Sequence, residues 1–379
     1  MTTAIHRLAL AAALLGSYSF TLAQPIPIYG VVELSGTGAT AGTNYDNGVK
    51  LAVKEINAAG GILKRPIEYT SWDTQTQSGV AKSLAAKAID QGAPIVMGPV
   101  FSGSILVSMA ETRKAEIPNM IGGEAASITQ QGNPFVFRAS FTQAAAMPKV
   151  VRYINEYVKA KTIALIYVNN DFGKGGRDMV LKELQASGIK VVADISTEGG
   201  QIDFSAAVLK AKQSNADALI AYTNEEESAR LLKELRKQGY DKPIIGETTI
   251  ANDKVIELAG EAANGVVAHV GLTPDAPNAT VQAFAKKYLA EYKFKADHNA
   301  MKGYTSMHAA KAIFDKVGKI DSKAFAAAMH GASISAKDYP GVLMDVKYDD
   351  KGDLDRESFI IKVVAGKAQV IETLKPASR

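Results

Sequence analysis

Glycine, serine, threonine and asparagine gather in short loops that follow predicted strands and precede predicted helices. The backbone N–H groups at the start of a helix, together with side-chain hydroxyls, can donate hydrogen bonds to an anion such as a carboxylate. Helix caps and turns are a sufficient explanation for any one of these loops. Ser102, which is followed by Gly103, is nevertheless the residue that we assign to ligand binding. The five loops are 35–38 (SGTG), 101–104 (FSGS), 122–127 (GGEAAS), 169–173 (NNDFG) and 223–225 (TNE).

No set of residues in the sequence has the spacing that catalysis or metal binding requires. The chain has no cysteine, and its histidines do not form an HExxH motif. Position 100 is Val, so the segment around Ser102 is not the GxSxG motif of hydrolases. The glycines of segment 36–42 depart from the dinucleotide fingerprint in the place of the third glycine. The acidic run 225–227 opens a predicted helix, where acids offset the helix dipole. We therefore expect no enzyme, no cofactor and no metal.

The first 23 residues have the pattern of a secretory signal peptide. His6 and Arg7 precede the apolar run 8–15 (LALAAALL), and small residues in 21–23 (TLA) precede a cleavage point ahead of Gln24. This run is shorter than the roughly 20 residues that span a bilayer. Because no cysteine follows it, lipid attachment is excluded, and we expect a protein exported to the periplasm that is not a lipoprotein.

The remaining sequence alternates strands with helices and begins this alternation twice. Its 379 residues suffice for two domains of roughly 150 residues each. The net charge of +4 comes without a basic run, so we expect no nucleic-acid partner. The segment 280–329 is predicted to be mostly helical and to pack back on the first domain. The predicted strands are 26–33, 66–73, 94–100, 117–122, 162–169, 190–196, 217–223, 243–247, 344–348 and 358–364, and the pattern predicts an α/β fold with parallel sheets.

Four segments of the sequence carry a resemblance to a known family. They are 31–62 (VVELSGTGATAGTNYDNGVKLAVKEINAAGGI), 95–105 (IVMGPVFSGSI), 117–129 (IPNMIGGEAASIT) and 169–180 (NNDFGKGGRDMV). The sequence resembles the leucine/isoleucine/valine-binding proteins, which are periplasmic substrate-binding components of ABC transporters. The resemblance implies a monomer that closes on a small amino acid or carboxylate and delivers it to an integral-membrane ABC permease.

The same resemblance implies the type I periplasmic binding protein fold, in which two doubly wound parallel-sheet lobes are joined by a three-strand hinge. It places the crossings near 141–144, 271–275 and 341–345. Lobe I would comprise 24–142 and 273–342, and lobe II would comprise 143–272 and 343–379, after a signal peptide of residues 1–23. Closure on the ligand is then a hinge motion.

The resemblance also implies roles for residues of this sequence. Ser102 and the backbone N–H groups of Gly123, Glu124 and Ala125 would bind the ligand carboxylate. Four positions depart from the family pattern. Ala125 stands where Thr or Ser is usual, Ala41 and Asn224 stand where tyrosines are found, and the position of the acid that receives an ammonium falls on Thr248, with Glu247 beside it.

These departures leave the ligand open. A buried ammonium without a partner costs several kcal/mol, so an amino-acid ligand requires Glu247 or Glu124 as its acceptor. Otherwise an amine-free aromatic or aliphatic carboxylate or an amide fits better, with Ala41 leaving room and Phe101 or Phe172 forming an apolar wall. Two further alternatives are a periplasmic sensor module that presents its ligand to a membrane receptor and an exported hydrolase.

Overall fold

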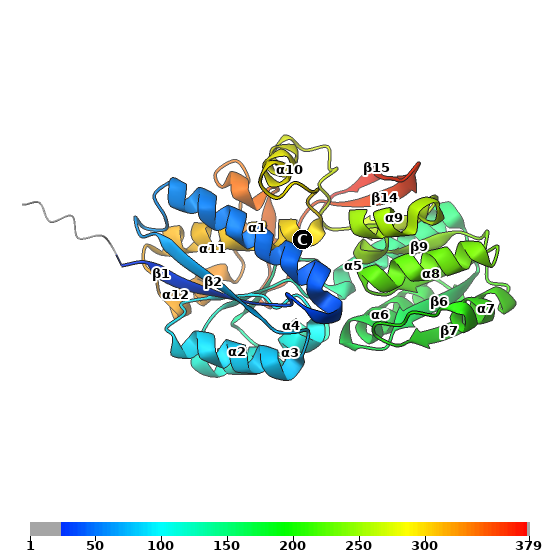
Figure 1. Ribbon diagram of the computed structural model, residues 1–379, viewed down its shortest axis with the longest axis horizontal. Coiled ribbons are helices and arrows are strands. Elements are labelled where there is room, and N and C mark those ends of the chain that lie inside the picture. Colours follow the sequence, from blue (N-terminus) through cyan, green and yellow to red (C-terminus); the bar gives the residue numbers. More distant parts are fainter. Residues whose placement is uncertain (1–23, 377–379) are drawn as a thin grey trace, which may run out of the picture.

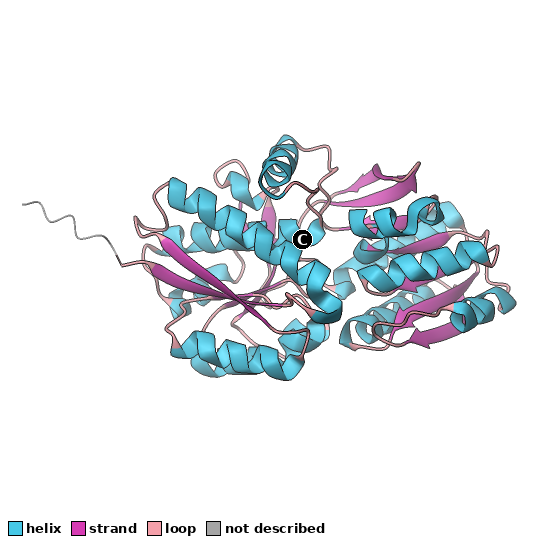
Figure 2. Ribbon diagram, in the orientation of Figure 1, coloured by secondary structure: helices cyan, strands magenta, loops and turns pink. Residues whose placement is uncertain are grey.

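The computed structural model describes residues 24–376 and contains two lobes, each built around a β-sheet (Figure 1). The signal peptide predicted for residues 1–23 lies outside the described residues. We use lobe I for the elements around the five-stranded sheet and lobe II for those around the seven-stranded sheet. In both lobes helices cover the sheet (Figure 2). The fold class is therefore α/β with parallel-sheet lobes, as the sequence predicted.

The lobe I sheet is parallel throughout, in the strand order β2-β1-β3-β4-β5. Side chains of β1 alternate between two apolar clusters, with Ile28 and Val32 in one and Val31 in the other, so both faces of the sheet are buried. The strands are β1 (Ile26–Val32), β2 (Ile67–Asp73), β3 (Val96–Met97), β4 (Asn119–Ile121) and β5 (Val136–Arg138).

Helices from two distant parts of the chain cover lobe I. The first part supplies α1 (Ala39–Ala58), α2 (Ser78–Asp90), α3 (Ser102–Ala115) and α4 (Ser127–Gln130). The helical segment after lobe II supplies α10 (Ala279–Tyr292), α11 (His298–Val317) and α12 (Ser322–Met329).

Helix α11 packs closely against α1, and two glycines make this contact possible. A Cβ on Gly48 of α1 would lie 2.0 Å from the Ala300 carbonyl oxygen, and one on Gly303 of α11 would lie 1.9 Å from that of Tyr45. The Tyr292 hydroxyl also donates to the Asn47 carbonyl oxygen at 2.8 Å. The chain therefore returns to lobe I after it has built most of lobe II.

The lobe II sheet has the order β15-β14-β10-β9-β8-β6-β7 and is parallel except at the edge formed by β14 and β15, which runs antiparallel. Its strands are β6 (Thr162–Val168), β7 (Lys190–Thr197), β8 (Ala218–Tyr222), β9 (Ile244–Glu247), β10 (Val267–Val270), β14 (Ser358–Val364) and β15 (Lys367–Leu374). Its helices are α5 (Gln143–Tyr153), α6 (Asp171–Ala186), α7 (Ser205–Gln213), α8 (Glu225–Lys237) and α9 (Asp253–Ala259).

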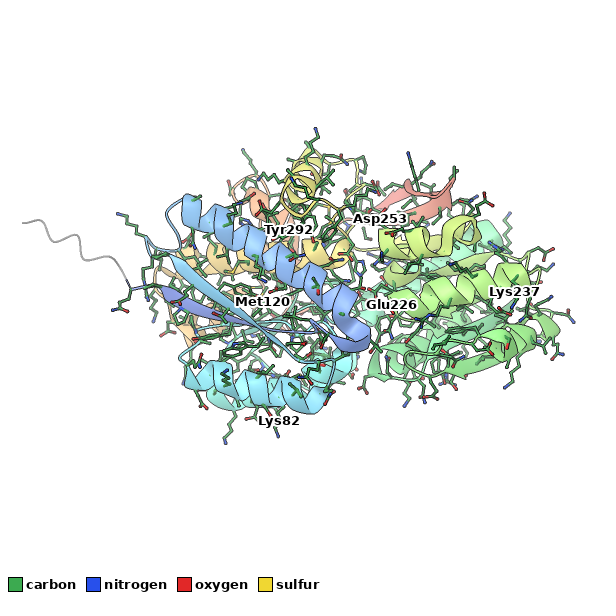
Figure 3. All side chains as sticks on the ribbon, in the orientation of Figure 1. Lys82, Met120, Glu226, Lys237, Asp253 and Tyr292 are labelled. Atoms are coloured by element: carbon green, nitrogen blue, oxygen red, sulfur yellow. The ribbon has the colours of Figure 1, made fainter. Side chains whose placement is uncertain are left out.

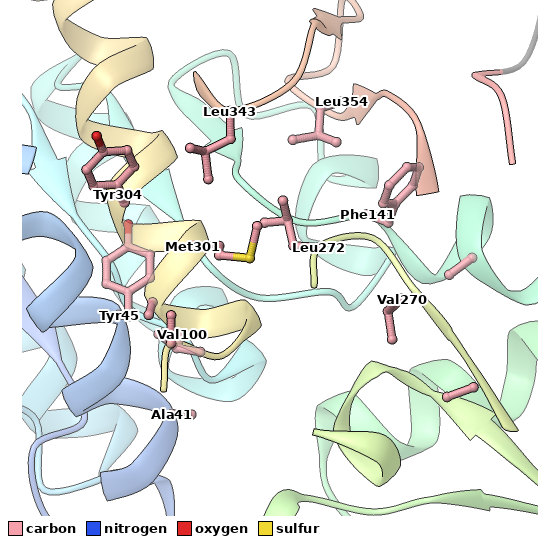
Figure 4. Close-up of a cluster of buried hydrophobic side chains, with 14 of the residues drawn as sticks. Ala41, Tyr45, Val100, Phe141, Val270, Leu272, Met301, Tyr304, Leu343 and Leu354 are labelled. Carbon is pink, nitrogen blue, oxygen red and sulfur yellow. The ribbon is translucent and has the colours of Figure 1, made fainter. Parts of the chain in front are cut away.

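Three crossings between the lobes meet around Phe141 (Figure 4). Phe141 lies on the first crossing, between β5 and α5. On the second, a Cβ at Gly271 would lie 2.3 Å from the Phe141 ring. On the third, the buried Arg356 donates to the Ala139 carbonyl oxygen at 2.8 Å, and its guanidinium lies 5.9 Å from the Phe141 ring centroid. Residues of all three crossings thus lie against Phe141.

A small third sheet precedes the last crossing. It contains β11 (Ser333–Ile334), β12 (Val346–Tyr348) and β13 (Leu354–Asp355), all antiparallel. The Gly352 carbonyl oxygen, in the turn between β12 and β13, accepts from the backbone N–H of Arg138 in β5 at 2.9 Å. These contacts attach the segment to lobe I before the chain reaches β14. The lobe boundaries inferred from the resemblance remain a prediction.

Several elements differ in extent or presence from the prediction. Helix α6 begins at Asp171, earlier than the start near Gly175 that the sequence predicts, because the Asn170 side chain caps it by accepting from the backbone N–H of Gly173 at 2.8 Å. The strands β5, β10, β11, β13 and β15 were not predicted. Strand β5 is short, and β15 alternates half-buried and exposed residues, so neither has a continuous apolar run.

Candidate functional site

A cavity lies where the loops at the carboxyl ends of the lobe I strands face the helix N-termini of lobe II. We call it the interlobe cavity. In Figure 3 Glu226 and Asp253, both of lobe II, lie on the side of that lobe that faces lobe I. The cavity is lined from lobe I by Ala41, Val100, Phe101, Ser102, Gly122, Gly123, Glu124, His298, Asn299 and Lys302, and from lobe II by Phe172, Asn224, Glu225 and Thr249.

The cavity is small because the two lobes lie close together around it. Its empty volume is about 380 Å³, part of which is open to solvent. Gly103 of α3 shows the same closeness, because a Cβ there would lie 2.9 Å from Asp171 Oδ2 of lobe II.

Ser102 is the first residue of α3, and a buried acid fixes the backbone that leads into this helix. Glu33, at the end of β1, accepts from the backbone N–H groups of Val100 at 3.0 Å and Phe101 at 3.2 Å. The Ser102 hydroxyl oxygen accepts from the backbone N–H of Ala125 at 3.3 Å. The hydroxyl proton and the first N–H groups of α3 can therefore be directed at a ligand anion.

A buried arginine fixes the neighbouring loop. Arg138 of β5 donates to the carbonyl oxygens of Gly123 at 2.6 Å and Ala125 at 2.7 Å. It also pairs with Asp353 at 2.5 Å. Because the carbonyl groups point to Arg138, the loop has one fixed conformation beside Ser102.

One ion pair lies within the lobe I wall. Lys302 Nζ of α11 lies 2.7 Å from Glu124 Oε1, and both residues are buried. Burial raises the pKa of Glu124 to about 7, the negative charge of Glu247 adds to this rise, and Lys302 opposes it. Glu247 is itself buried and does not line the cavity.

A second acid, Glu225, faces the cavity from lobe II. Asn224 and Glu227 form a capping box at the N-terminus of α8, so the carboxyl of Glu225, the first helical residue, is free for other partners. Its Oε1 accepts from Asn299 Nδ2 at 3.2 Å and lies 3.9 Å from His298 Nε2. Burial raises the pKa of Glu225 to about 7. His298 has a pKa well below its usual value because it is buried and close to Lys302.

The apolar part of the wall is formed by Ala41, Val100, Phe101 and Phe172. The Phe172 ring stacks on Tyr222 with centroids 4.4 Å apart, so it packs within lobe II and also lines the cavity.

In geometry and chemistry the interlobe cavity can bind a small molecule with an anionic end, a hydrogen-bond donor and an apolar part. Within residues 24–376 no group of three or more His, Asp and Glu side chains is arranged to hold a metal ion.

The family model of periplasmic binding proteins matches residues 25–368. The chain belongs to the periplasmic binding protein family. It is 26% identical over 369 residues, 95% of each chain, to the leucine-, isoleucine-, valine-, threonine- and alanine-binding protein of Pseudomonas aeruginosa. It is a substrate-binding protein of the ABC transporter family. Its relatives are periplasmic transport proteins rather than enzymes.

Solved structures of this family share the fold. The branched-chain amino acid transporter substrate binding protein LivJ from Streptococcus pneumoniae, in complex with isoleucine, matches with a TM-score of 0.83 and 26% identity, over 93% of this chain and 100% of that one. An ABC transporter solute binding protein from R. palustris, in complex with benzoate, matches with a TM-score of 0.84 and 22% identity, over 93% and 97%. The fold is therefore that of type I periplasmic binding proteins.

The structure of this periplasmic binding protein brings most of the predicted site residues together. Ala41, Phe101, Ser102, Gly123, Glu124, Phe172 and Asn224 line the interlobe cavity. Gly103, Ala125, Glu247 and Thr248 do not line it: Gly103 lies against Asp171, Ala125 donates to Ser102, and the Thr248 hydroxyl donates to the Glu247 carboxyl.

Several lining residues were not among those predicted. Lys302, His298 and Asn299 come from α11, more than 170 residues after Ser102, and no local motif marks them. Glu225 was interpreted as an acid that offsets the helix dipole, and its position in one of the polar loops was the signal that could have found it. Val100, Gly122 and Thr249 also line the cavity.

None of the helices in residues 24–376 combines the length and the apolar composition that a membrane span requires.

Proposed function

We propose that this protein captures a branched-chain or related amino acid in the interlobe cavity and delivers it to an integral-membrane ABC permease. The observation that carries the proposal is the composition of the cavity wall. It combines the hydroxyl and amide donors around Ser102 with two buried acids, Glu124 and Glu225, and only one buried lysine, Lys302. An amino-acid zwitterion supplies a carboxylate for the donors around Ser102 and an ammonium for the acids.

The ligand carboxylate would bind at the N-terminus of α3. The Ser102 hydroxyl and nearby N–H groups are donors, and the helix N-terminus favours a negative charge. Glu33 and Arg138 hold this loop in place, so little ordering is required when the ligand binds. An aliphatic side chain would then contact Phe101 and Phe172, both of which line the cavity.

The acids support an amine on the ligand. With Glu124, Glu225 and Lys302 all ionised, two negative charges face one positive charge, an excess of one. A ligand ammonium removes this excess, whereas a buried excess charge is costly. The LivJ structure with isoleucine and the P. aeruginosa relative agree with an amino-acid ligand.

Delivery would follow hinge closure between the lobes. Loops from both lobes line the cavity, so a bound ligand contacts both and stabilises the closed form. The closed, loaded monomer would dock on the permease in the periplasm after the signal peptide has been removed. No bond in the ligand changes in this cycle.

One observation favours a second candidate ligand, an amine-free carboxylate. Glu124 already has a cation, since Lys302 lies 2.7 Å from it. If Glu225 is protonated, the cavity contains no excess negative charge and an aromatic or aliphatic acid would bind without an amine. The R. palustris protein with benzoate has the same fold.

A thermal-shift panel tests the two candidates. Leucine, isoleucine and valine are compared with benzoate and 4-methylpentanoate, because a ligand that binds only the folded protein raises its melting temperature. Stabilisation by the amino acids alone supports the proposal. Stabilisation by the amine-free acids alone would replace it with the second candidate, and stabilisation by none of them would reject both.

Substitution of Ser102 tests the carboxylate site. Ser102→Ala should weaken a carboxylate ligand by roughly 1.5–3 kcal/mol, the range for a hydrogen bond to a charged group, measured by calorimetry. Ser108→Ala is the matched control, because Ser108 is buried in the same helix and its hydroxyl donates to the Ile105 carbonyl oxygen, away from the cavity. Equal affinity of both variants would remove Ser102 from the site.

A further inference from the structure

Among the acids at the interlobe cavity, Glu225 has no basic side chain as its partner. Its carboxyl oxygen contacts Asn299, a neutral amide, and His298 Nε2 at 3.9 Å. Within residues 24–376 no lysine or arginine nitrogen forms an ion pair with it, although it is only 7% exposed. A carboxylate buried in this way is costly unless a cation joins it.

The two other acids of this region are already occupied or enclosed. Glu124 is paired with Lys302 at 2.7 Å. Glu247 does not line the cavity, accepts from the Thr248 hydroxyl, and lies 3.5 Å from His269 Nδ1. A ligand amine at Glu124 would share that carboxyl with Lys302, and Glu247 does not line the cavity. Glu225 lines the cavity and, among residues 24–376, has no lysine or arginine paired with it.

The side chains that contact Glu225 supply no cation to its carboxyl. From α11 it faces Asn299 and His298, and further along that helix Lys302, whose Nζ is bound to Glu124. Asp297 adds a negative charge nearby. His298 is neutral near pH 7, because its pKa lies well below the usual value. One neutral donor, Asn299, thus orients the carboxyl without neutralising it.

We infer that Glu225, contributed by lobe II, is the acceptor of the ligand ammonium and selects amino acids over amine-free acids. The inference rests on the proposed function and assigns a residue to it. The ligand would then bridge the lobes, with its carboxylate on Ser102 of lobe I and its ammonium on Glu225. Closure would bring the carboxyl to the amine.

The test compares ligands that differ in the amine. Leucine and 4-methylpentanoate have the same carboxylate and the same branched chain, and the second lacks the ammonium. Calorimetric affinities are measured for the wild type, Glu225→Gln and Glu226→Gln. Glu226 is the matched control, because it is the next residue of the same helix, is exposed, and among residues 24–376 forms an ion pair only with Arg230, at 3.8 Å.

Glu225→Gln should weaken leucine by roughly 10- to 100-fold, the loss of a hydrogen bond to a charged group, and leave 4-methylpentanoate within about threefold. Glu226→Gln should change neither. Equal losses for both ligands in Glu225→Gln would overturn the inference, because they would mean that Glu225 only holds the lobes together through Asn299. A selective loss of leucine in Glu124→Gln but not in Glu225→Gln would also overturn it, by moving the amine to Glu124.

The wild type separates this inference from the proposed function. If the wild type binds leucine and the Glu225→Gln substitution changes the affinities for leucine and 4-methylpentanoate by the same factor, only the role of Glu225 falls. If the wild type binds none of leucine, isoleucine and valine, the proposed function falls and the role of Glu225 falls with it.

Discussion

On the lobe I wall of the interlobe cavity, Ser102 and Glu124 are held by partners of their own lobe. Glu33 and Arg138 fix the two loops, and Lys302 neutralises Glu124. On the lobe II wall, the Glu225 carboxyl is held by Asn299, which belongs to lobe I. The lobe I wall therefore has these contacts without lobe II. The contact of Glu225 on the lobe II wall forms only when the lobes are closed.

This difference assigns separate tasks to the lobes. A wall that is fixed in advance loses little entropy when a ligand binds, so lobe I can capture the anionic end. A wall whose acid finds its partners only in the closed form links recognition to closure. Selectivity for an amine and the closing motion then depend on the same side chain.

The largest expected effect is that of breaking the lobe I support. Arg138→Leu leaves the carbonyl oxygens of Gly123 and Ala125 without donors and Asp353 without its cation. Removal of one partner of a buried pair costs about 3–5 kcal/mol. Urea denaturation should show a loss of that size in the free energy of unfolding.

Arg177→Leu is the matched control for Arg138. Arg177 pairs with Asp178 at 2.8 Å and with Asp194, but it is 31% exposed and lies in lobe II. Exposed pairs contribute about 0–1 kcal/mol. If the two variants lost equal stability, the lobe I loops would not depend on a buried arginine.

A smaller effect is expected from the pH dependence of Glu225. Its pKa of about 7 lies above the value of an unfolded glutamate, so the folded protein holds its proton more tightly than the unfolded chain does. That contribution to stability is present at low pH and is lost as the pH rises through about 7.

Unfolding of the ligand-free protein measures this effect by difference. Between pH 5 and 8 the wild type should lose about 2 kcal/mol relative to Glu225→Gln, which cannot titrate at this position. The difference removes the contributions of His269, His298 and His308, which are present in both proteins. Parallel profiles for the two proteins would show that the pKa of Glu225 is not raised in the ligand-free folded protein.

The sequence predicted the lobe I wall better than the lobe II wall, for a physical reason. Ser102 and Gly123 lie in short loops after strands, and parallel strands bring such loops to one edge of the sheet. Strand β1, with alternating residues buried on its two faces, and helix α1 with its apolar stripe were likewise visible as periodic patterns. Local pattern is enough for these elements.

Lys302 and Glu225 required information that local pattern does not contain. Lys302 reaches the cavity because α11 packs on α1 through Gly48 and Gly303, a contact between segments more than 250 residues apart. Glu225 stands in a run of three acids, and only the fold shows that its neighbour Glu227 takes the capping role and leaves it for the cavity. Glu226, between them, is exposed.

The smallest expected effect concerns a contact between the lobes outside the cavity. Lys295, in the loop before α11, pairs with Asp253 of α9 at 3.0 Å and with Asp275 at 3.3 Å. The first of these pairs joins lobe I to lobe II. Because Lys295 does not line the interlobe cavity, it can affect ligand affinity only through the closing equilibrium.

Lys295→Ala should therefore weaken every ligand by the same factor, about 1.4- to fivefold, since an exposed pair contributes about 0.2–1 kcal/mol. The effect should shrink at high salt, which screens exposed charges. Lys254→Ala is the matched control, because Lys254 is also exposed but pairs with Glu257 in its own helix at 3.1 Å. Calorimetry with leucine and 4-methylpentanoate distinguishes the two roles: a loss confined to leucine would mean that Lys295 acts on the ammonium site and not on closure.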